Sequence, residues 1–139
     1  MPRTDFYVLK SADRQSRLQF TCKLAQKALQ HQLTLGIWAA DDAMAVELDK
    51  LLWAYQPESY LPHSLCPSPE PAPPILISAN LHALNCPLII NLSQAIVPAE
   101  QTPERIAEIV IQQDAVLRQT RQRYREYQER GYTLNMHNL

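Results

Sequence analysis

LTLGIWA, at residues 33–39, is apolar at nearly every position. A strand with one face in water alternates apolar and polar residues, whereas a strand covered on both faces forms a continuous apolar run. The stretch therefore predicts a strand inside an open, mostly parallel sheet that is flanked by helices. LIINL, at residues 88–92, has the same character and predicts a second strand of this kind.

Helical patterns lie on both sides of the first of these strands. Before it, apolar residues recur at helical spacing up to about Gln30, and Asp13 or Ser16 can cap this helix. After it, the aspartates at 41–42 place negative charge at the start of a second helix, where such charge is favourable. FYVL at residues 6–9 supplies an earlier strand. The order strand, helix, strand, helix predicts an α/β fold.

The second half of the chain adds further strands and a terminal helix. A proline-rich loop covers residues 66–74, and ILIS at residues 75–78 follows it as a strand. Residues 106–111 are apolar enough for a fifth strand, although a short helix remains an alternative. The last helix is expected to begin near Asp114. We therefore predict one domain over residues 1–139, with the proline-rich loop inside it.

Composition narrows the class of protein. The chain contains 2 glycines, Gly36 and Gly131, so it has no glycine-rich loop that could hold a phosphate. We expect a Rossmann-like fold without that loop and without a cofactor. The net charge of -1 argues for a small anionic partner rather than a long nucleic-acid track. The N-terminus lacks the apolar run of a signal peptide and no segment is apolar enough for a membrane span, which predicts a cytoplasmic protein.

No set of residues forms a recognisable catalytic or metal site. His63 has no adjacent partner that would make it a general base. The aspartates at 41–42 could hold magnesium, but a role as helix caps explains them more simply. The cysteines are odd in number and form no CxxC, so reduced thiols are expected at Cys22, Cys66 and Cys86. A zinc site is the weaker alternative, because its spacing matches no standard pattern; it would use His63, Cys66, His82 and Cys86.

The most basic stretch of the chain is RQTRQRYREYQERGY, at residues 118–132. It holds five of the 13 Lys and Arg residues. It has no proline, and Gly131 stands where a helix would stop, so the stretch predicts a helix with a glycine cap.

Helical geometry gathers part of this charge on one face. Arg118, Arg121 and Arg125 share that face and Tyr124 lies on its edge, whereas Arg123 points away. Arg121, Arg123 and Tyr124 are expected to be surface groups. The pattern predicts a cationic strip with an aromatic wall, suited to nucleic acid or to an acidic peptide. A helix that is merely solvated remains the alternative.

Several stretches together resemble the chi subunit family of bacterial DNA polymerase III holoenzyme. They follow the order of that family and cover most of the chain: FYVL at 6–9, LDKLLW at 48–53, ESYLPHSL at 58–65, IINLS at 89–93 and RYREYQERGYTLN at 123–135. The resemblance implies a non-enzymatic accessory of the clamp loader that binds the psi subunit. It also implies binding of the acidic C-terminal tail of single-stranded DNA-binding protein, which ends in Pro-Phe, so that nucleic acid is reached only indirectly.

The resemblance also assigns residues to the tail site. Its central members are Arg121, Tyr124 and Arg125, with Val110, Tyr60 and Trp53 as apolar neighbours. A basic residue that the family often carries one turn before Arg121 is replaced here by Leu117, and the adjacent Arg118 is the candidate substitute.

The psi-binding surface is not located by this resemblance, although a partly exposed apolar patch is expected for it. Two other functions stay open from the residues alone. One is direct nucleic-acid binding through the same arginines, and the other is a small nucleotide- or metal-dependent enzyme.

Overall fold

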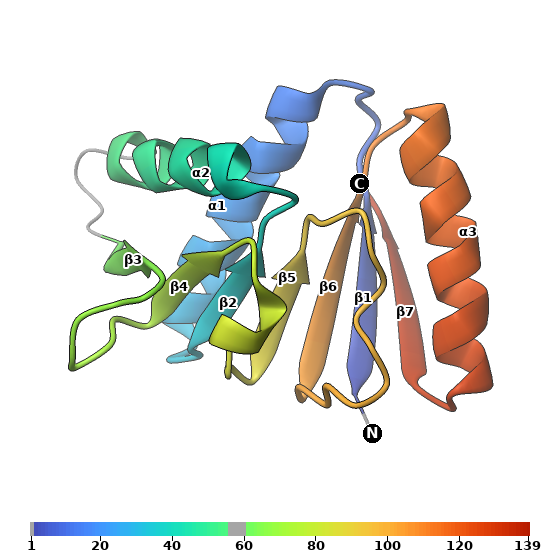
Figure 1. The fold of residues 1–139 in the computed structure, drawn as a ribbon. Helices are drawn as coiled ribbons and strands as arrows, with labels where there is room; N and C mark the ends of the chain where they lie inside the picture. The colour runs from blue at the N-terminus through green and yellow to red at the C-terminus, as the bar shows by residue number, and fades with distance from the viewer. Residues whose placement is uncertain (1, 56–60) are drawn as a thin grey trace.

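Within the part of the chain that the structure describes, seven strands form one sheet with the order β3-β4-β2-β5-β6-β1-β7 (Figure 1). The computed structural model describes residues 2–55 and 61–139. All neighbouring strands are parallel. The strands are β1 (Arg3–Val8), β2 (Leu35–Trp38), β3 (His63–Leu65), β4 (Ile75–Ser78), β5 (Leu88–Asn91), β6 (Arg105–Val110) and β7 (Thr133–Asn138). The helices are α1 (Arg14–Gln30), α2 (Asp42–Ala54), α3 (Asp114–Glu129) and the short 3₁₀ helix η1 (Leu81–Ala83).

Strand β2 lies in the interior of the sheet, as its apolar sequence predicts. It pairs with β4 on one side and with β5 on the other. Gly36 of this strand allows the segment after η1 to approach closely, since a Cβ atom at this position would stand 3.0 Å from the Cβ of Leu84. The prediction of a buried parallel strand is confirmed, and so is the strand at residues 75–78.

Helices cover both faces of the sheet (Figure 1). On one face, Leu18 of α1 and Leu48 of α2 pack with Ile37 in a first core cluster. On the other face, Tyr127 of α3 packs with Phe6 in a second cluster. Neighbouring residues of β1 point to opposite faces, because side chains alternate along a strand. The predicted open α/β architecture is therefore confirmed.

Aspartate side chains begin the first two helices. The carboxylate of Asp13 accepts a hydrogen bond from the backbone N–H of Gln15 at 3.1 Å. Asp41 Oδ1 accepts one from the N–H of Met44 at 2.8 Å. Each satisfies a donor that has no partner inside its helix. The geometry gives Asp41 the capping role that the sequence favoured over magnesium binding.

Two strands were not predicted. β7 alternates the apolar Leu134 and Met136 with polar residues, a short strand pattern that sequence reasoning missed, and it pairs in parallel with β1, with Asp5 opposite Asn135. β3 is short and, among the described strands, pairs with β4 alone. The choice between strand and helix at residues 106–111 resolves as strand β6, which lies between β5 and β1. β1 begins earlier than predicted, because Thr4 and Asp5 are buried although polar.

None of the described helices is both long enough and apolar enough to cross a membrane.

Candidate functional site

Helix α3 carries the basic stretch, and its ends follow the sequence signals. Asp114 stands in its first turn, where a negative charge is favourable. The helix ends before Gly131, whose φ of 82° lies in the left-handed region that glycine adopts without strain. The backbone N–H of Gly131 donates to the carbonyl of Gln128 at 3.0 Å. The predicted helix and its glycine cap are confirmed.

A buried polar network fastens α3 to the sheet. Its centre is the carboxylate of Glu108 on β6, whose side chain is 3% exposed. Glu108 accepts hydrogen bonds from Arg123 Nη1 at 2.8 Å, from the hydroxyl of Tyr127 at 2.9 Å and from the amide of Asn91 at 3.0 Å. Arg123 Nη2 also donates to the carbonyl of Ser93 at 3.0 Å. A network in which the charged partners have hydrogen bonds fixes the orientation of the helix on the sheet.

The buried network also affects the ionisation of Tyr127. Burial raises the pKa of this phenol well above its ordinary value, and the neighbouring Glu108 carboxylate raises it further. Tyr127 therefore stays protonated, and its hydroxyl remains a donor to Glu108.

The expectation that Arg123 lies at the surface is wrong, and Arg130 of the same stretch is also engaged by the protein. Arg123 is 5% exposed and pairs with Glu108. Arg130 lies over the rings of Tyr127 and Tyr132, at 5.4 and 5.7 Å from their centroids, and donates to the carbonyl of Val97 at 2.7 Å. Helical geometry places Arg123 away from Arg121, as predicted, but that direction leads into the protein rather than into solvent.

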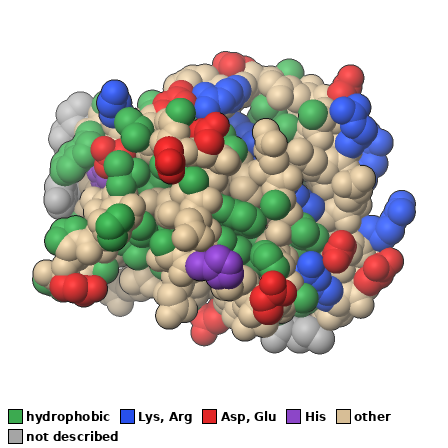
Figure 2. Space-filling view, in the orientation of Figure 1, with side chains coloured by type: hydrophobic (Ala, Val, Ile, Leu, Met, Phe, Trp, Pro, Cys, Tyr) green, Lys and Arg blue, Asp and Glu red, His purple; other side chains and the backbone are tan. Residues whose placement is uncertain are grey.

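The remaining three arginines form an exposed strip. Arg118, Arg121 and Arg125 are all exposed. Figure 2 shows Lys and Arg side chains gathered over the margin of the molecule where α3 lies. Within the described residues, these three guanidinium groups make no hydrogen bond or ion pair, so their donors are available to a partner. We call Arg118, Arg121 and Arg125 the α3 strip.

Tyr124 stands beside the α3 strip and is half-buried. Its ring lies against Phe6, with centroids 5.5 Å apart and planes tilted by 45°. Val110 and Leu117 belong to the same core cluster as Tyr124. Val110 is only 2% exposed, so it is a core residue that packs beneath Tyr124 and does not reach the surface. The structure thus brings Tyr124, Val110 and the α3 strip together, as the resemblance implied.

Leu117, where a basic residue was expected, is partly buried against this same cluster. A side chain at this position therefore points partly inward. Arg118 is exposed on the α3 strip.

Trp53 and Tyr60 do not extend the site. Trp53 lies on α2, and its ring contacts that of His63 on the edge strand β3, with centroids 4.7 Å apart. Helix α3 lies at the opposite side of the sheet, over β6 and β7 (Figure 1). The expectation that Trp53 neighbours the tail site is therefore wrong, because α2 and α3 lie over different strands. Tyr60 is outside the described residues.

His63 and Cys22 lie in the buried environments of structural residues. His63 is buried, and its two ring nitrogens lie 2.6 Å from the carbonyl of Leu61 and 3.1 Å from that of Asp49. Cys22 is a buried free thiol, and burial raises its pKa to about 11. Cys66 and Cys86 are also free thiols. Among residues 2–55 and 61–139, no three His, Cys, Asp or Glu side chains gather in an arrangement suited to a metal ion.

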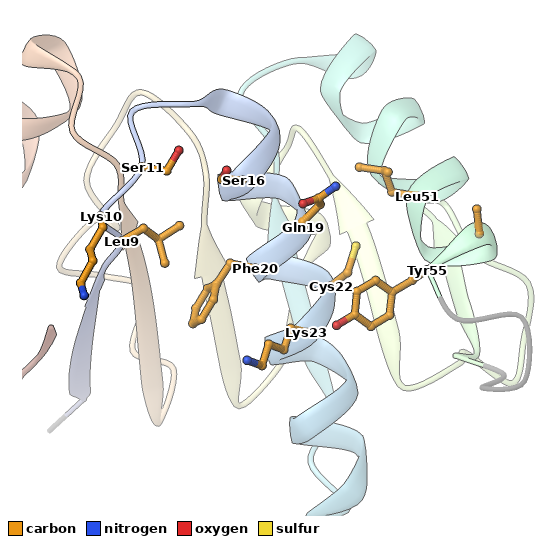
Figure 3. Close-up of a pocket in the computed structure, with 11 residues that line it drawn as sticks. Leu9, Lys10, Ser11, Ser16, Gln19, Phe20, Cys22, Lys23, Leu51 and Tyr55 are labelled. Atoms are coloured by element: carbon orange, nitrogen blue, oxygen red, sulfur yellow. The ribbon is translucent and has the colours of Figure 1, made fainter. Parts of the chain in front are cut away.

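The hollow nearest the carboxyl end of β1 also lacks a catalytic set. It has a volume of about 570 Å³ and lies beside α1. Figure 3 shows Lys10 and Ser11 on the segment after β1, Phe20 and Lys23 on α1, and Tyr55 after α2. Cys22 also lines it, but its raised pKa makes this thiol a poor nucleophile. Most of the lining is apolar or a lysine stem, so the hollow is a binding surface at most.

Sequence reasoning missed the groups that hold the site in place. Glu108 reads as one polar residue in an apolar strand, and Asn91 as another. A buried polar residue inside an apolar run is a usable signal, because it requires a partner. Which partner it takes depends on which elements the fold brings together.

Comparison with known proteins identifies the family of the chain. The chain matches the family model described as "DNA polymerase III chi subunit, HolC" over residues 1–135. It is 37% identical over 139 residues to the DNA polymerase III subunit chi of Pseudomonas aeruginosa, covering 100% of this chain and 98% of that protein. The subunit chi of Haemophilus influenzae is 30% identical over 139 residues, with 96% and 95% covered. That of Escherichia coli is 25% identical over 120 residues, with 84% and 82% covered. The chain therefore belongs to the DNA polymerase III chi subunit family.

Proposed function

We propose that this protein is a non-catalytic, cytoplasmic accessory subunit of the replicative DNA polymerase. In this role it links the clamp loader, through the psi subunit, to the acidic C-terminal tail of single-stranded DNA-binding protein. The observation that carries the proposal is the α3 strip. Three exposed arginines stand next to a half-buried tyrosine on a helix that buried hydrogen bonds hold in one orientation.

The chemistry of the tail fits this surface. The tail is a short anion that ends in an aromatic side chain and a carboxylate. Arginine offers a planar fork of donors for a carboxylate, and the exposed strip has such forks without internal partners to displace. Tyr124, backed by Phe6, provides an aromatic surface for the terminal phenylalanine. Charge attracts the tail and the apolar contact selects its end.

The proposed contact with psi falls elsewhere on the molecule. Trp53 is 58% exposed and Val46 is 43% exposed. They are seven residues apart on α2, so they lie on one face of that helix. Large exposed apolar side chains at an edge of the fold are typical of protein–protein contacts. We assign the psi contact to this α2 face, which leaves α3 open for the tail.

Isothermal titration calorimetry with a tail peptide tests the first contact. Arg121→Ala should weaken binding by about 1–3 kcal/mol, the usual range for a charged hydrogen bond. Tyr124→Ala should weaken it as well, by removing the aromatic wall. A peptide without its final phenylalanine should bind poorly even with all its acidic residues present. Higher salt should weaken binding without abolishing it, because the apolar contact is not screened.

The control variants come from the structure. Arg123→Ala is unsuitable, because it opens the buried network. Lys50→Ala removes an exposed charge from α2, and Gln122→Ala changes an exposed neighbour on α3. Both should bind the peptide as the unchanged protein does. Equal affinity for Arg121→Ala and Lys50→Ala would place the tail away from the α3 strip.

The psi contact has a separate test. Trp53→Ala should reduce co-purification with psi, whereas Met136→Ala, which changes a side chain that is 51% exposed on β7, should not. Thermal unfolding of both variants shows whether either change disturbs the fold. Retention of psi by a folded Trp53→Ala protein would overturn the assignment to α2.

A further inference from the structure

A second basic region lies on the face of the sheet opposite α3. It is a cavity of about 480 Å³ between α1 and strands β1, β6 and β7. Four Lys or Arg side chains line it, and Asp5 supplies the one acidic side chain among its described lining residues. These four are Arg3, Lys23, Lys27 and Arg105. With its histidines neutral, four positive charges and one negative charge leave +3, in a chain whose net charge is -1.

Asp5 organises these cations. Its side chain is 2% exposed, and it receives hydrogen bonds from Arg105 Nη2 at 3.2 Å and from Arg3 Nη2 at 3.3 Å. His137 Nε2 lies 3.0 Å from the same carboxylate. Burial opposes the charge on Asp5, but the hydrogen bonds from His137 and Arg105 and the charges of both arginines leave its pKa below the ordinary value. One buried carboxylate thus holds two guanidinium groups close together.

The arginines keep donors that Asp5 does not use. Arg105 Nε is buried, and no described residue accepts a hydrogen bond from it. The Arg105 side chain is 36% exposed, so part of its guanidinium remains accessible from the cavity. Lys23 and Lys27 stand one turn apart on α1 and are exposed. Fixed forks of donors with two mobile ammonium groups beside them suit a phosphate.

Aromatic groups complete the lining. Tyr7 stacks on His137, with centroids 4.8 Å apart and planes 13° apart, and its ring lies 5.4 Å from that of Phe20. Phe20 and Lys23 also line the hollow of Figure 3, in which both extend from α1. Cations beside aromatic rings are the combination that binds nucleotides, with the phosphate on the former and the base on the latter. The volume lies in the range of small-molecule sites.

From this geometry we propose that the cavity binds a nucleotide through its phosphate, either free or as part of a single DNA strand. Arg3 and Arg105 take the phosphate, Lys23 and Lys27 add charge from α1, and the Tyr7–Phe20–His137 side receives the base. The site is separate from the α3 strip, because the sheet lies between them. Both sites can therefore be occupied at once.

The test measures binding of 5′-labelled tetrathymidylate by fluorescence anisotropy, with thymidine monophosphate and inorganic phosphate as competitors. The variant is Lys23→Gln/Lys27→Gln, which changes two exposed side chains that make no hydrogen bond to another described residue. Loss of two phosphate contacts on a single strand should reduce the slope of log K against log salt by about 1.4, which corresponds to roughly 25-fold weaker binding at 0.1 M salt. Lys50→Gln, an exposed lysine outside the cavity, should leave binding unchanged.

The competitors distinguish the two sources of the phosphate. Displacement by thymidine monophosphate supports a site for a free nucleotide, and resistance to it supports a site for a strand. The proposal would be overturned by no binding of the tetranucleotide, by equal binding by the double variant, or by loss of binding in Arg121→Ala, which would move the phosphate to α3. Preferential binding of an acidic peptide that depends on Lys23 and Lys27 would also overturn it.

Discussion

Arg123→Ala should unfold the protein far more readily than any change on the α3 strip. The side chains of Arg123 and Glu108 are 6% and 3% exposed, with Nη1 and Oε1 2.8 Å apart. The substitution leaves a buried carboxylate without its cation and removes the hydrogen bond to the Ser93 carbonyl. Breaking a buried pair from one side typically costs about 3–5 kcal/mol. An exposed change such as Arg121→Ala should stay within about 0.5 kcal/mol.

The structure allows this magnitude to be checked by a double-mutant cycle. Tyr127 and Asn91 still donate to Glu108 after the change, so part of the carboxylate remains satisfied. Adding Glu108→Gln to Arg123→Ala removes the uncompensated charge and should restore at least half of the lost stability. Glu108→Gln alone should be destabilising, because it leaves the guanidinium buried without a counter-ion.

Urea unfolding followed by circular dichroism gives the free energies for the four proteins of the cycle. A loss below about 1 kcal/mol for Arg123→Ala would show that the pair does not anchor α3, against the range expected for a buried pair. If the changes in the free energy of unfolding from the two substitutions simply add, the pair likewise does not anchor α3, because two groups that interact directly give a non-additive result.

Two further predictions concern other parts of the fold. The partners of Asp5 lower its pKa in the folded protein. Its contribution to stability should therefore be complete above the pKa of the unfolded chain and should disappear as the pH falls through the lower folded pKa. Urea unfolding between neutral and acidic pH should show this loss of stability in the unchanged protein and not in Asp5→Asn. Gly36→Ala should cost about 1–3 kcal/mol in thermal or urea unfolding, because its new Cβ would meet Leu84 Cβ at 3.0 Å and Ile89 Cδ1 at 3.2 Å, and a neutral result would mean that the η1 segment moves aside freely.

The sequence by itself determined the fold class and most of the elements. Continuous apolar runs required buried parallel strands, as β2 and β5 are. Asp13 and Asp41 marked helix starts, and Gly131 marked a helix end, through local hydrogen bonds and local backbone conformation. These features depend on residues a few positions apart, so they can be derived before the chain is folded.

The sequence also located the exposed face of α3, because Arg118, Arg121 and Arg125 share a face by helical spacing alone. It could not tell whether the opposite face meets water or protein. The structure shows that this face meets protein, because Arg123 is buried and pairs with Glu108, 15 positions away in the sequence. The structure also places Trp53 far from α3, because Trp53 lies on α2 and the helices α2 and α3 lie over different strands.

Only the tertiary structure decided which distant charges meet. Asp5 lies 100 positions from Arg105 and 132 from His137, yet all three converge because β6, β1 and β7 are neighbours in the sheet. The short alternating pattern of β7 does not say which strand it joins, and the structure pairs it with β1. Strand order is set by the burial of whole helices and sheet faces, a property that no local spacing of residues contains.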